Sequence, residues 1–279
     1  MDATDGSTET VGTIRTADRL PAEGVDADRM AGHWLLARLG KRILRPGGVE
    51  LTAKLLAAVD IKRGDDVVEL APGLGATTQL ILDRSPKSYR GVDRDPVAVE
   101  RVAMLAAGPN RSVVQGTAAD TGLDDESADV AFGEAYLTMQ PTSQKERIVA
   151  ELRRILRPGG RMAIHEVAFR SGVSNADRER VTEELRSAIK VHVSPLGEEE
   201  WKDLLSNNGF RVTAHETAPL HLLEPRRLIA DEGMVGAAKF ALRVLSDSEA
   251  RSRVISMRRA MSGNDDVLEA VMISVERVA

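Results

Sequence analysis

The sequence has no cysteine, few aromatic residues, no long apolar run and no excess of basic residues. Without cysteine, disulfides, thiolate metal sites and cysteine nucleophiles are excluded, and a reducing, cytoplasmic location is expected. Four Phe, two Trp and two Tyr are too few for a platform that stacks single-stranded nucleic acid. The 38 basic residues are outnumbered by 43 acidic ones, which disfavours a nucleic-acid partner. No apolar run reaches the roughly 18–20 residues of a membrane span, so no membrane partner is expected.

What is present is enough apolar material for a sizeable core. The 279 residues are 42% hydrophobic and 29% charged, which is typical of a folded domain. Residues 1–28 are rich in Asp, Glu, Thr and Gly and have no periodic apolar face, so a disordered tail is predicted there. They also lack the basic start and apolar centre of a signal peptide. Residues 29–279 are expected to form a single domain.

Strands alternate with helices through the middle of the chain. This alternation favours an α/β fold, a doubly wound and mostly parallel sheet with helices on both faces. Helical spacing predicts a first helix from His33 to Ile43, stopped by the turn at 45–48. The other predicted helices include 49–59, 76–82, 141–156, 175–191, 198–208 and most of 225–261, and the predicted strands are 66–70, 89–92, 112–115, 128–132, 161–167, 210–218 and 270–275.

The most informative segment is the glycine-rich loop at residues 69–75, which joins a predicted strand to a helix. Glycines in such a loop let the backbone approach a ligand closely, although a plain tight turn is the alternative. Asp93 ends the next strand, eighteen residues after Gly75, where an acidic side chain accepts hydrogen bonds from ribose hydroxyls. Asp93 would otherwise cap the following helix, but Asp95 already suits that role.

The sequence of the loop distinguishes between two candidate cofactors, a nicotinamide dinucleotide and S-adenosylmethionine. A nicotinamide-binding loop requires a third small residue, whereas Gly73-Leu74-Gly75 is followed by Ala76-Thr77-Thr78. Glu69 also places a negative charge beside the loop, which suits a ligand with an ammonium and a sulfonium better than a pyrophosphate. The balance favours S-adenosylmethionine as the cofactor.

These motifs resemble those of the class I S-adenosylmethionine-dependent methyltransferases that act on small molecules. The segment Glu69-Leu70-Ala71-Pro72-Gly73-Leu74-Gly75 resembles the first motif, and Gly91-Val92-Asp93 is similar to the second. Further similar segments, in the family's order, are Gly116-Thr117-Ala118, Ser127-Ala128-Asp129-Val130, the turn 156–161 and the stretch 200–210. The resemblance spans about 49–217 and implies the family's strand order, with an antiparallel last strand for which 270–275 is the candidate.

The resemblance also implies roles for individual residues. Glu69 would lie near the methionine amino group, Gly73 and Gly75 would give backbone room, and Asp93 would hold the ribose. Ala71 would also contact the cofactor. Arg94 would flank the adenine, whose ring would meet the amide of Ala118. The sequence departs from the family pattern twice: Ala71-Pro72 replaces the commoner Gly-x, and Thr117 stands where the family often has Asp. A hydroxyl or a carbonyl at Thr117 can substitute as acceptor.

Candidate chemistry lies at the carboxyl ends of two later strands. His165 is a candidate general base, because the ordinary pKa of histidine lies near neutral pH; a structural histidine is the alternative. Glu134 would contact the cofactor or the acceptor, or is a charged loop residue. His192, His215 and His221 are expected at the surface or in a covering segment. No His, Asp and Glu residues cluster at metal-ligand spacing, so no metal site is predicted.

Residues 221–261 are too apolar for an exposed loop. They either complete the core or form a lid, with Phe240 and Met234 facing the acceptor. The leading function is methyl transfer from S-adenosylmethionine to a small, partly apolar molecule. An NAD(P)-dependent oxidoreductase and a non-catalytic S-adenosylmethionine-binding protein are the alternatives.

Overall fold

The computed structural model describes residues 22, 24–43, 45–220 and 222–279. Most of the tail predicted at 1–28 therefore lies outside the described residues, as does His221. The strands are β1 (Asp66–Leu70), β2 (Ser88–Asp93), β3 (Arg111–Gln115), β4 (Ala128–Glu134), β5 (Leu156–Phe169), β6 (Leu196–Gly197), β7 (Phe210–Ala218) and β8 (Leu268–Arg277). The helices are α1 (Gly32–Arg38), α2 (Gly48–Val59), α3 (Ala76–Leu82), α4 (Pro96–Leu105), α5 (Thr142–Ile155), α6 (Asn175–Ile189), α7 (Glu198–Asn207), α8 (Pro225–Ser246) and α9 (Ser248–Ser262).

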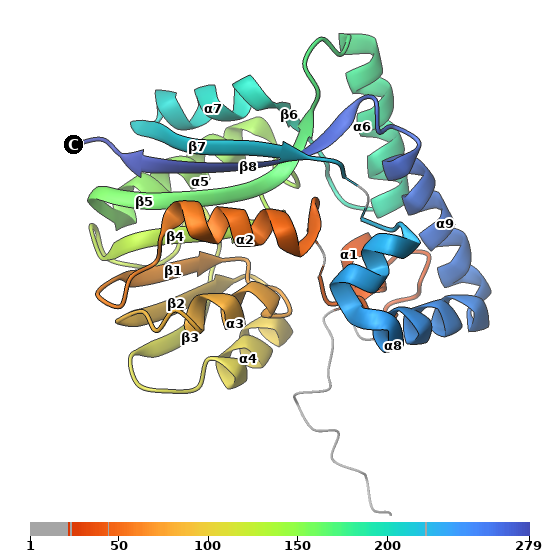
Figure 1. Cartoon of the computed structure of the whole chain (residues 1–279), viewed down its shortest axis with the longest axis horizontal. Helices are drawn as coiled ribbons and strands as arrows, with labels where there is room; N and C mark the ends of the chain where they lie inside the picture. Colours follow the sequence, from red (N-terminus) through yellow and green to blue (C-terminus); the bar gives the residue numbers. More distant parts are fainter. Residues whose placement is uncertain (1–21, 23, 44, 221) are drawn as a thin grey trace, which may run out of the picture.

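The strands form one sheet in the order β3-β2-β1-β4-β5-β8-β7, with the short β6 paired to β5 (Figure 1). The pairs from β3 to β5 are parallel, and β8 runs antiparallel to both β5 and β7. The predicted mostly parallel sheet is therefore confirmed, and so is the antiparallel last strand. That strand extends beyond 270–275 at both ends.

Both faces of the sheet are covered, as the apolar strands require. Successive residues of β1 alternate between two cores, since Val67 joins one apolar cluster and Val68 the other. Helices α2 and α3 contribute to the first cluster, whereas α5 and α7 contribute to the second. Helices α1, α6, α8 and α9 gather beyond the carboxyl ends of the parallel strands, as Figure 1 shows. No helix among the described residues is long and apolar enough to cross a membrane.

The first helix is shorter than predicted. It ends at Arg38 rather than reaching Ile43, because Gly40 adopts a left-handed φ of 103°. The amides of Gly40 and Lys41 turn back to the carbonyls of Ala37 and Leu36, at 2.9 Å each, which is a Schellman ending. After Gly40 the chain therefore leaves the helix axis and passes beside α8.

Candidate active site

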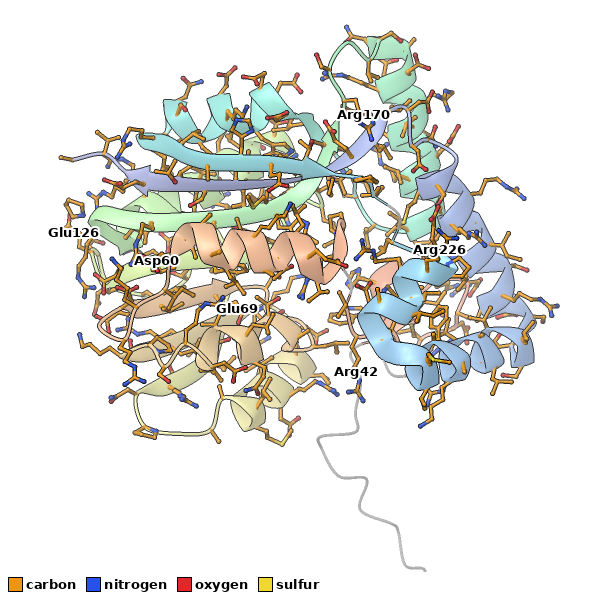
Figure 2. The ribbon with its side chains drawn as sticks, viewed as in Figure 1. Arg42, Asp60, Glu69, Glu126, Arg170 and Arg226 are labelled. Atoms are coloured by element: carbon orange, nitrogen blue, oxygen red, sulfur yellow. The ribbon has the colours of Figure 1, made fainter. Side chains whose placement is uncertain are left out.

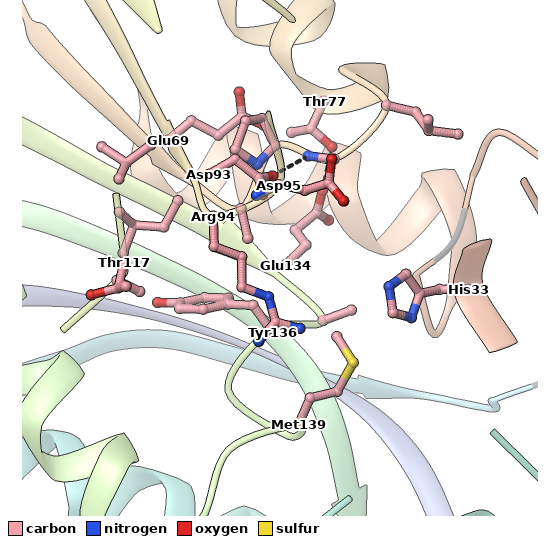
Figure 3. A pocket seen from close by; sticks show the side chains of 18 of the residues that line it. His33, Glu69, Thr77, Asp93, Arg94, Asp95, Thr117, Glu134, Tyr136 and Met139 are labelled. Carbon is pink, nitrogen blue, oxygen red and sulfur yellow. Dashed lines mark hydrogen bonds between the residues drawn. The ribbon is translucent and has the colours of Figure 1, made fainter. Parts of the chain in front are cut away.

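One pocket of about 580 Å³ lies at the carboxyl ends of β1, β2 and β4 (Figure 3). It opens where the strand order reverses between β1 and β4, the position at which doubly wound sheets bind ligands. Eight of the ten predicted site residues line it: Glu69, Ala71, Gly73, Asp93, Arg94, Thr117, Ala118 and Glu134. Gly75 and His165 do not line the pocket.

The glycine-rich loop forms one wall through left-handed backbone. Ala71, Gly73 and Gly75 have φ angles of 51°, 56° and 79°. A Cβ on Gly75 would lie 2.6 Å from the side chain of Leu105, so this position accepts only glycine without a shift. Ala71 adopts the conformation that a glycine would provide, at a cost of roughly 1–2 kcal/mol. The amide of Ala71 is tied to the carbonyl of Val92 at 2.8 Å.

The loop geometry leads to a test of these two positions. Gly75→Ala should lower the free energy of unfolding by about 1–2 kcal/mol, because a Cβ strains the left-handed backbone and the end of the exposed Leu105 side chain must also move aside. Ala71→Gly should change it by less than about 1 kcal/mol, because the strain relieved is offset by the greater freedom of the unfolded chain. Urea unfolding of both variants measures the difference. Equal losses for the two substitutions would contradict this account of the loop.

Asp93 holds the loop and faces the pocket at the same time. One carboxylate oxygen accepts from the amide of Gly73 at 3.1 Å and the other from the amide of Asp95 at 3.0 Å. Asp95 caps α4 through the amides of Val97 and Ala98, so Asp93 is not needed as the cap. Burial raises the pKa of Asp93, although the two amide hydrogen bonds act in the opposite direction.

Glu69 lies at the end of β1 and is almost completely buried. Its carboxylate accepts from the hydroxyls of Thr78 and Tyr89, each at 2.6 Å. Burial raises the pKa of Glu69 to about 7, against the lowering effect of these two hydrogen bonds. The side chain is therefore poised to gain or lose its charge near neutral pH.

Glu134 is the centre of a polar network at the end of β4. Its carboxylate accepts from the hydroxyl of Thr52 at 2.5 Å and from that of Thr77, and it lies 3.2 Å from Nη1 of Arg45. Burial acts to raise the pKa of Glu134, but the charge of Arg45 and the contact with His165 outweigh it and lower the value to about 2. Glu134 is consequently ionised and paired.

His165 lies beneath this network rather than in the pocket. The ring is completely buried, with Nδ1 2.8 Å from Oε1 of Glu134. Its Nε2 has no hydrogen-bond partner within the described chain. Because ionised Glu134 can only accept, the proton is assigned to Nδ1. This geometry allows His165 to orient Glu134 but gives it no direct route to an acceptor in the pocket.

The opposite end of the pocket is formed by Arg94, Thr117 and Ala118. The carbonyl of Thr117 already accepts from the amide of Asp120 at 3.1 Å, which leaves its hydroxyl as the freer acceptor. The amide of Ala118 makes no backbone hydrogen bond in the part of the chain that the structure describes. An acceptor and a donor are thus available side by side at this end.

Sequence reasoning placed the N-terminal helices at the acceptor pocket but did not identify the residues of α1 and of the following segment that form its wall. His33, Trp34 and Arg45 line the pocket, and Nδ1 of His33 is buried without a partner among the described residues. Burial lowers the pKa of His33 to about 4. Arg45 was interpreted only as part of a helix stop, and no spacing in the sequence links it to Glu134. The loop residues Tyr136 and Met139 also line the pocket.

Of the two alternatives for the late insertion, a lid or part of the core, its described residues favour the core. Phe240 is buried in the core cluster, and the side chain of Met234 is 79% exposed. Neither residue lines the pocket. The lid interpretation is therefore wrong for these two side chains, and Phe240 completes the core instead.

Comparisons with known proteins agree with this geometry. Residues 68–164 match a family described as a methyltransferase domain. The chain is 32% identical over 250 residues to an uncharacterised protein from Haemophilus influenzae, covering 88% of this chain and 98% of that protein. It shares the fold of a putative sarcosine dimethylglycine methyltransferase from Galdieria sulphuraria, with 18% identity, a TM-score of 0.65 and coverage of 82% and 84%.

A second solved structure with this fold is phosphoethanolamine N-methyltransferase 2 from Haemonchus contortus, which was determined with phosphomonomethylethanolamine and S-adenosylhomocysteine. It is 15% identical, has a TM-score of 0.66, and the match covers 89% of this chain and 58% of that one. The family match begins in β1, includes the glycine-rich loop and Asp93, and ends in β5, so it contains the strands that build the pocket. With this strand order and this loop, the chain belongs to the class I S-adenosylmethionine-dependent methyltransferases.

Proposed function

We propose that the protein transfers a methyl group from S-adenosylmethionine to a small-molecule acceptor that is partly apolar. One observation carries the proposal. Two acidic side chains, Glu69 and Asp93, lie near the carboxyl ends of the adjacent strands β1 and β2 and line the pocket on either side of the glycine-rich loop. When bound, the cofactor supplies a methyl group on a positively charged sulfur. The protein contributes by holding the two reactants in line in a site that excludes water.

The polar groups of the pocket fit this cofactor. Asp93 would accept from the ribose hydroxyls, and Glu69 would face the ammonium of the methionine part. Arg94, the hydroxyl of Thr117 and the amide of Ala118 would contact the adenine. Ala71 and Gly73 would contact the cofactor along the loop, where Gly73 leaves space for a close approach.

Arg45 would pair with the carboxylate of the methionine part. It is buried, it lines the same pocket, and its Nε has no hydrogen-bond partner among the described residues. A buried guanidinium with a spare donor favours a planar anion such as a carboxylate. Glu134, held by His165 on its far side, would then keep Arg45 in place.

The acceptor would lie against His33, Trp34 and Met139. A pocket of about 580 Å³ is within the usual range of small-molecule sites, roughly 300–1,000 Å³. Trp34 and Met139 supply apolar contacts, and the unpaired nitrogen of His33 offers one polar contact. We further propose that residues 29–279 act as one domain, since α1 and α9 share a core cluster with the sheet.

Binding and turnover assays together test this function. The proposal predicts saturable calorimetric binding of S-adenosylhomocysteine and none of NADH, whereas an oxidoreductase would give the reverse. Incubation with isotopically labelled methyl donor and a metabolite extract should then produce a labelled small molecule. Binding without release of S-adenosylhomocysteine would instead favour the non-catalytic binding protein.

The raised pKa of Glu69 predicts how affinity depends on pH. Below pH 7 the carboxyl is mainly protonated and cannot attract an ammonium, whereas above pH 7 it is ionised. Affinity for S-adenosylhomocysteine should therefore rise by about fivefold from pH 6 to pH 7, with a proton released on binding. Calorimetry in buffers of different ionisation enthalpy measures this proton. The profile of Glu69→Gln should be flat, and an equally steep profile in that variant would exclude Glu69 as the titrating group.

A further inference from the structure

The late helical insertion is connected to the pocket through an intermediate segment. Among the described residues of α8 and α9, none lines the pocket. Two acidic residues of α8, Asp231 and Glu232, instead bind the segment 41–43, which leads to Arg45. Figure 2 shows Arg42 of this segment beside α8.

The first connection is a buried ion pair. Nζ of Lys41 lies 2.9 Å from Oδ2 of Asp231, and both side chains are completely shielded from solvent. Removing two charges from water is unfavourable unless each finds the other in good geometry. The pair therefore restricts the segment to the one position in which Lys41 reaches Asp231.

The second connection fixes the backbone itself. Oε1 of Glu232 accepts from the amide of Arg42 at 2.7 Å and from the amide of Ile43 at 2.9 Å. Both acidic residues stand directly before Gly233, where α8 is interrupted by a non-helical φ of 71°. The end of a helical stretch disfavours carboxylates, so these two depend on the donors of the segment.

Helix α8 also contacts the backbone before and after Arg45, at Gly40 and at Gly48. A Cβ on Gly40 would lie 2.6 Å from Nη1 of Arg243, and a Cβ on Gly48 would collide with the guanidinium of Arg227. Two arginines of one helix thus lie against two glycines that flank Arg45. A Cβ at either glycine would have to push aside the end of an arginine side chain of α8.

We infer that Asp231 and Glu232 are positioning residues for Arg45. Two residues beyond Ile43, Arg45 reaches Glu134 at 3.2 Å, and Glu134 contacts His165 at 2.8 Å. The insertion thereby sets the geometry of the pocket without touching what binds there. The effect on cofactor affinity rests on the proposed function of Arg45, whereas the effect on the network of Glu134 and His165 does not.

The test uses the whole protein and two readouts. The first is the ¹⁵N resonance of the His165 imidazole without ligand, assigned by its loss in His165→Gln. Glu232→Ala removes both backbone hydrogen bonds at a position where Ala favours a helix. It should shift this resonance in the same direction as Arg45→Met does. Glu232→Gln keeps an acceptor oxygen and should restore the wild-type signal, and Glu216→Gln, at an exposed ion pair with Lys54, is the matched control.

The second readout is the affinity for S-adenosylhomocysteine. Glu232→Ala should weaken it about tenfold by misplacing Arg45, and should add no further loss in the Arg45→Met background. An unchanged His165 resonance in Glu232→Ala overturns the inference, and so do additive losses. If the wild-type protein does not bind S-adenosylhomocysteine, the proposed function fails, while the resonance still decides whether Glu232 positions Arg45.

Discussion

Replacing Asp93 by Ala should weaken the binding of S-adenosylhomocysteine by roughly 30- to 1,000-fold. The proposed contacts to the ribose are two charge-assisted hydrogen bonds, worth together about 2–4 kcal/mol. The carboxylate also accepts from the amides of Gly73 and Asp95, so its loss releases the glycine-rich loop that forms the pocket wall. Titration calorimetry on the wild type and the variant gives the ratio of dissociation constants.

The control for Asp93 separates binding from folding. Asp93→Asn keeps one acceptor oxygen and should fall between the wild type and Asp93→Ala in affinity. The melting temperature of each variant without ligand shows how much of the change comes from the loop. Unchanged affinity in Asp93→Ala would remove this residue from the cofactor site.

Replacing Glu166 should have the largest effect on stability. Its buried carboxylate accepts from the amides of Tyr136 and Leu137, at 3.0 and 2.8 Å. It also accepts from the amide and hydroxyl of Thr138, at 2.9 and 2.7 Å. Glu166→Ala leaves these donors buried without an acceptor, which should lower the free energy of unfolding by about 3–5 kcal/mol.

Glu166→Gln keeps the shape of the side chain and therefore tests the hydrogen-bonding role of the carboxylate alone. Glu166→Gln turns an NH₂ group toward one set of donors, so we expect it to lose about 2–4 kcal/mol although its shape is unchanged. Glu269→Gln removes the charge that faces the partly exposed Arg170 but keeps an acceptor oxygen, and it should cost less than about 1 kcal/mol. Urea unfolding of the three variants gives the order. A loss in Glu166→Gln no larger than that in Glu269→Gln would show that the loop 136–138 does not depend on the carboxylate.

The parts of the fold that local signals encode could be predicted from the sequence. Strands such as β1 and β4 are short apolar runs, and Asp95-Pro96 marks the start of α4 because capping and the fixed φ of proline act within one turn. The strand order followed from the resemblance of the motifs. The roles of Glu69 and Asp93 rest on the same resemblance and stay predictions.

The rest of the site depends on contacts between distant parts of the chain. Helical spacing continued to Ile43, but the left-handed Gly40 ends α1 five residues earlier, and the pattern of apolar residues does not show this. Lys41 and Asp231 are 190 residues apart, and so are Arg42 and Glu232. Neither the type of a residue nor its spacing in the sequence indicates a contact partner so far along the chain. For the same reason, the sequence left open whether His165 is a general base or a structural histidine, and its contact with Glu134, 31 residues away, was not visible there.

The position of β8 in the sheet has a consequence for synthesis on the ribosome. Among the residues that the structure describes, β7 pairs with no strand except β8, and β8 follows it only after about 50 residues of insertion. At about 5–20 residues per second, the nascent chain carries β7 for about 3–10 s with nothing to join. During that interval the outer edge of β5 is also open along most of its length, and an open edge invites pairing with other chains.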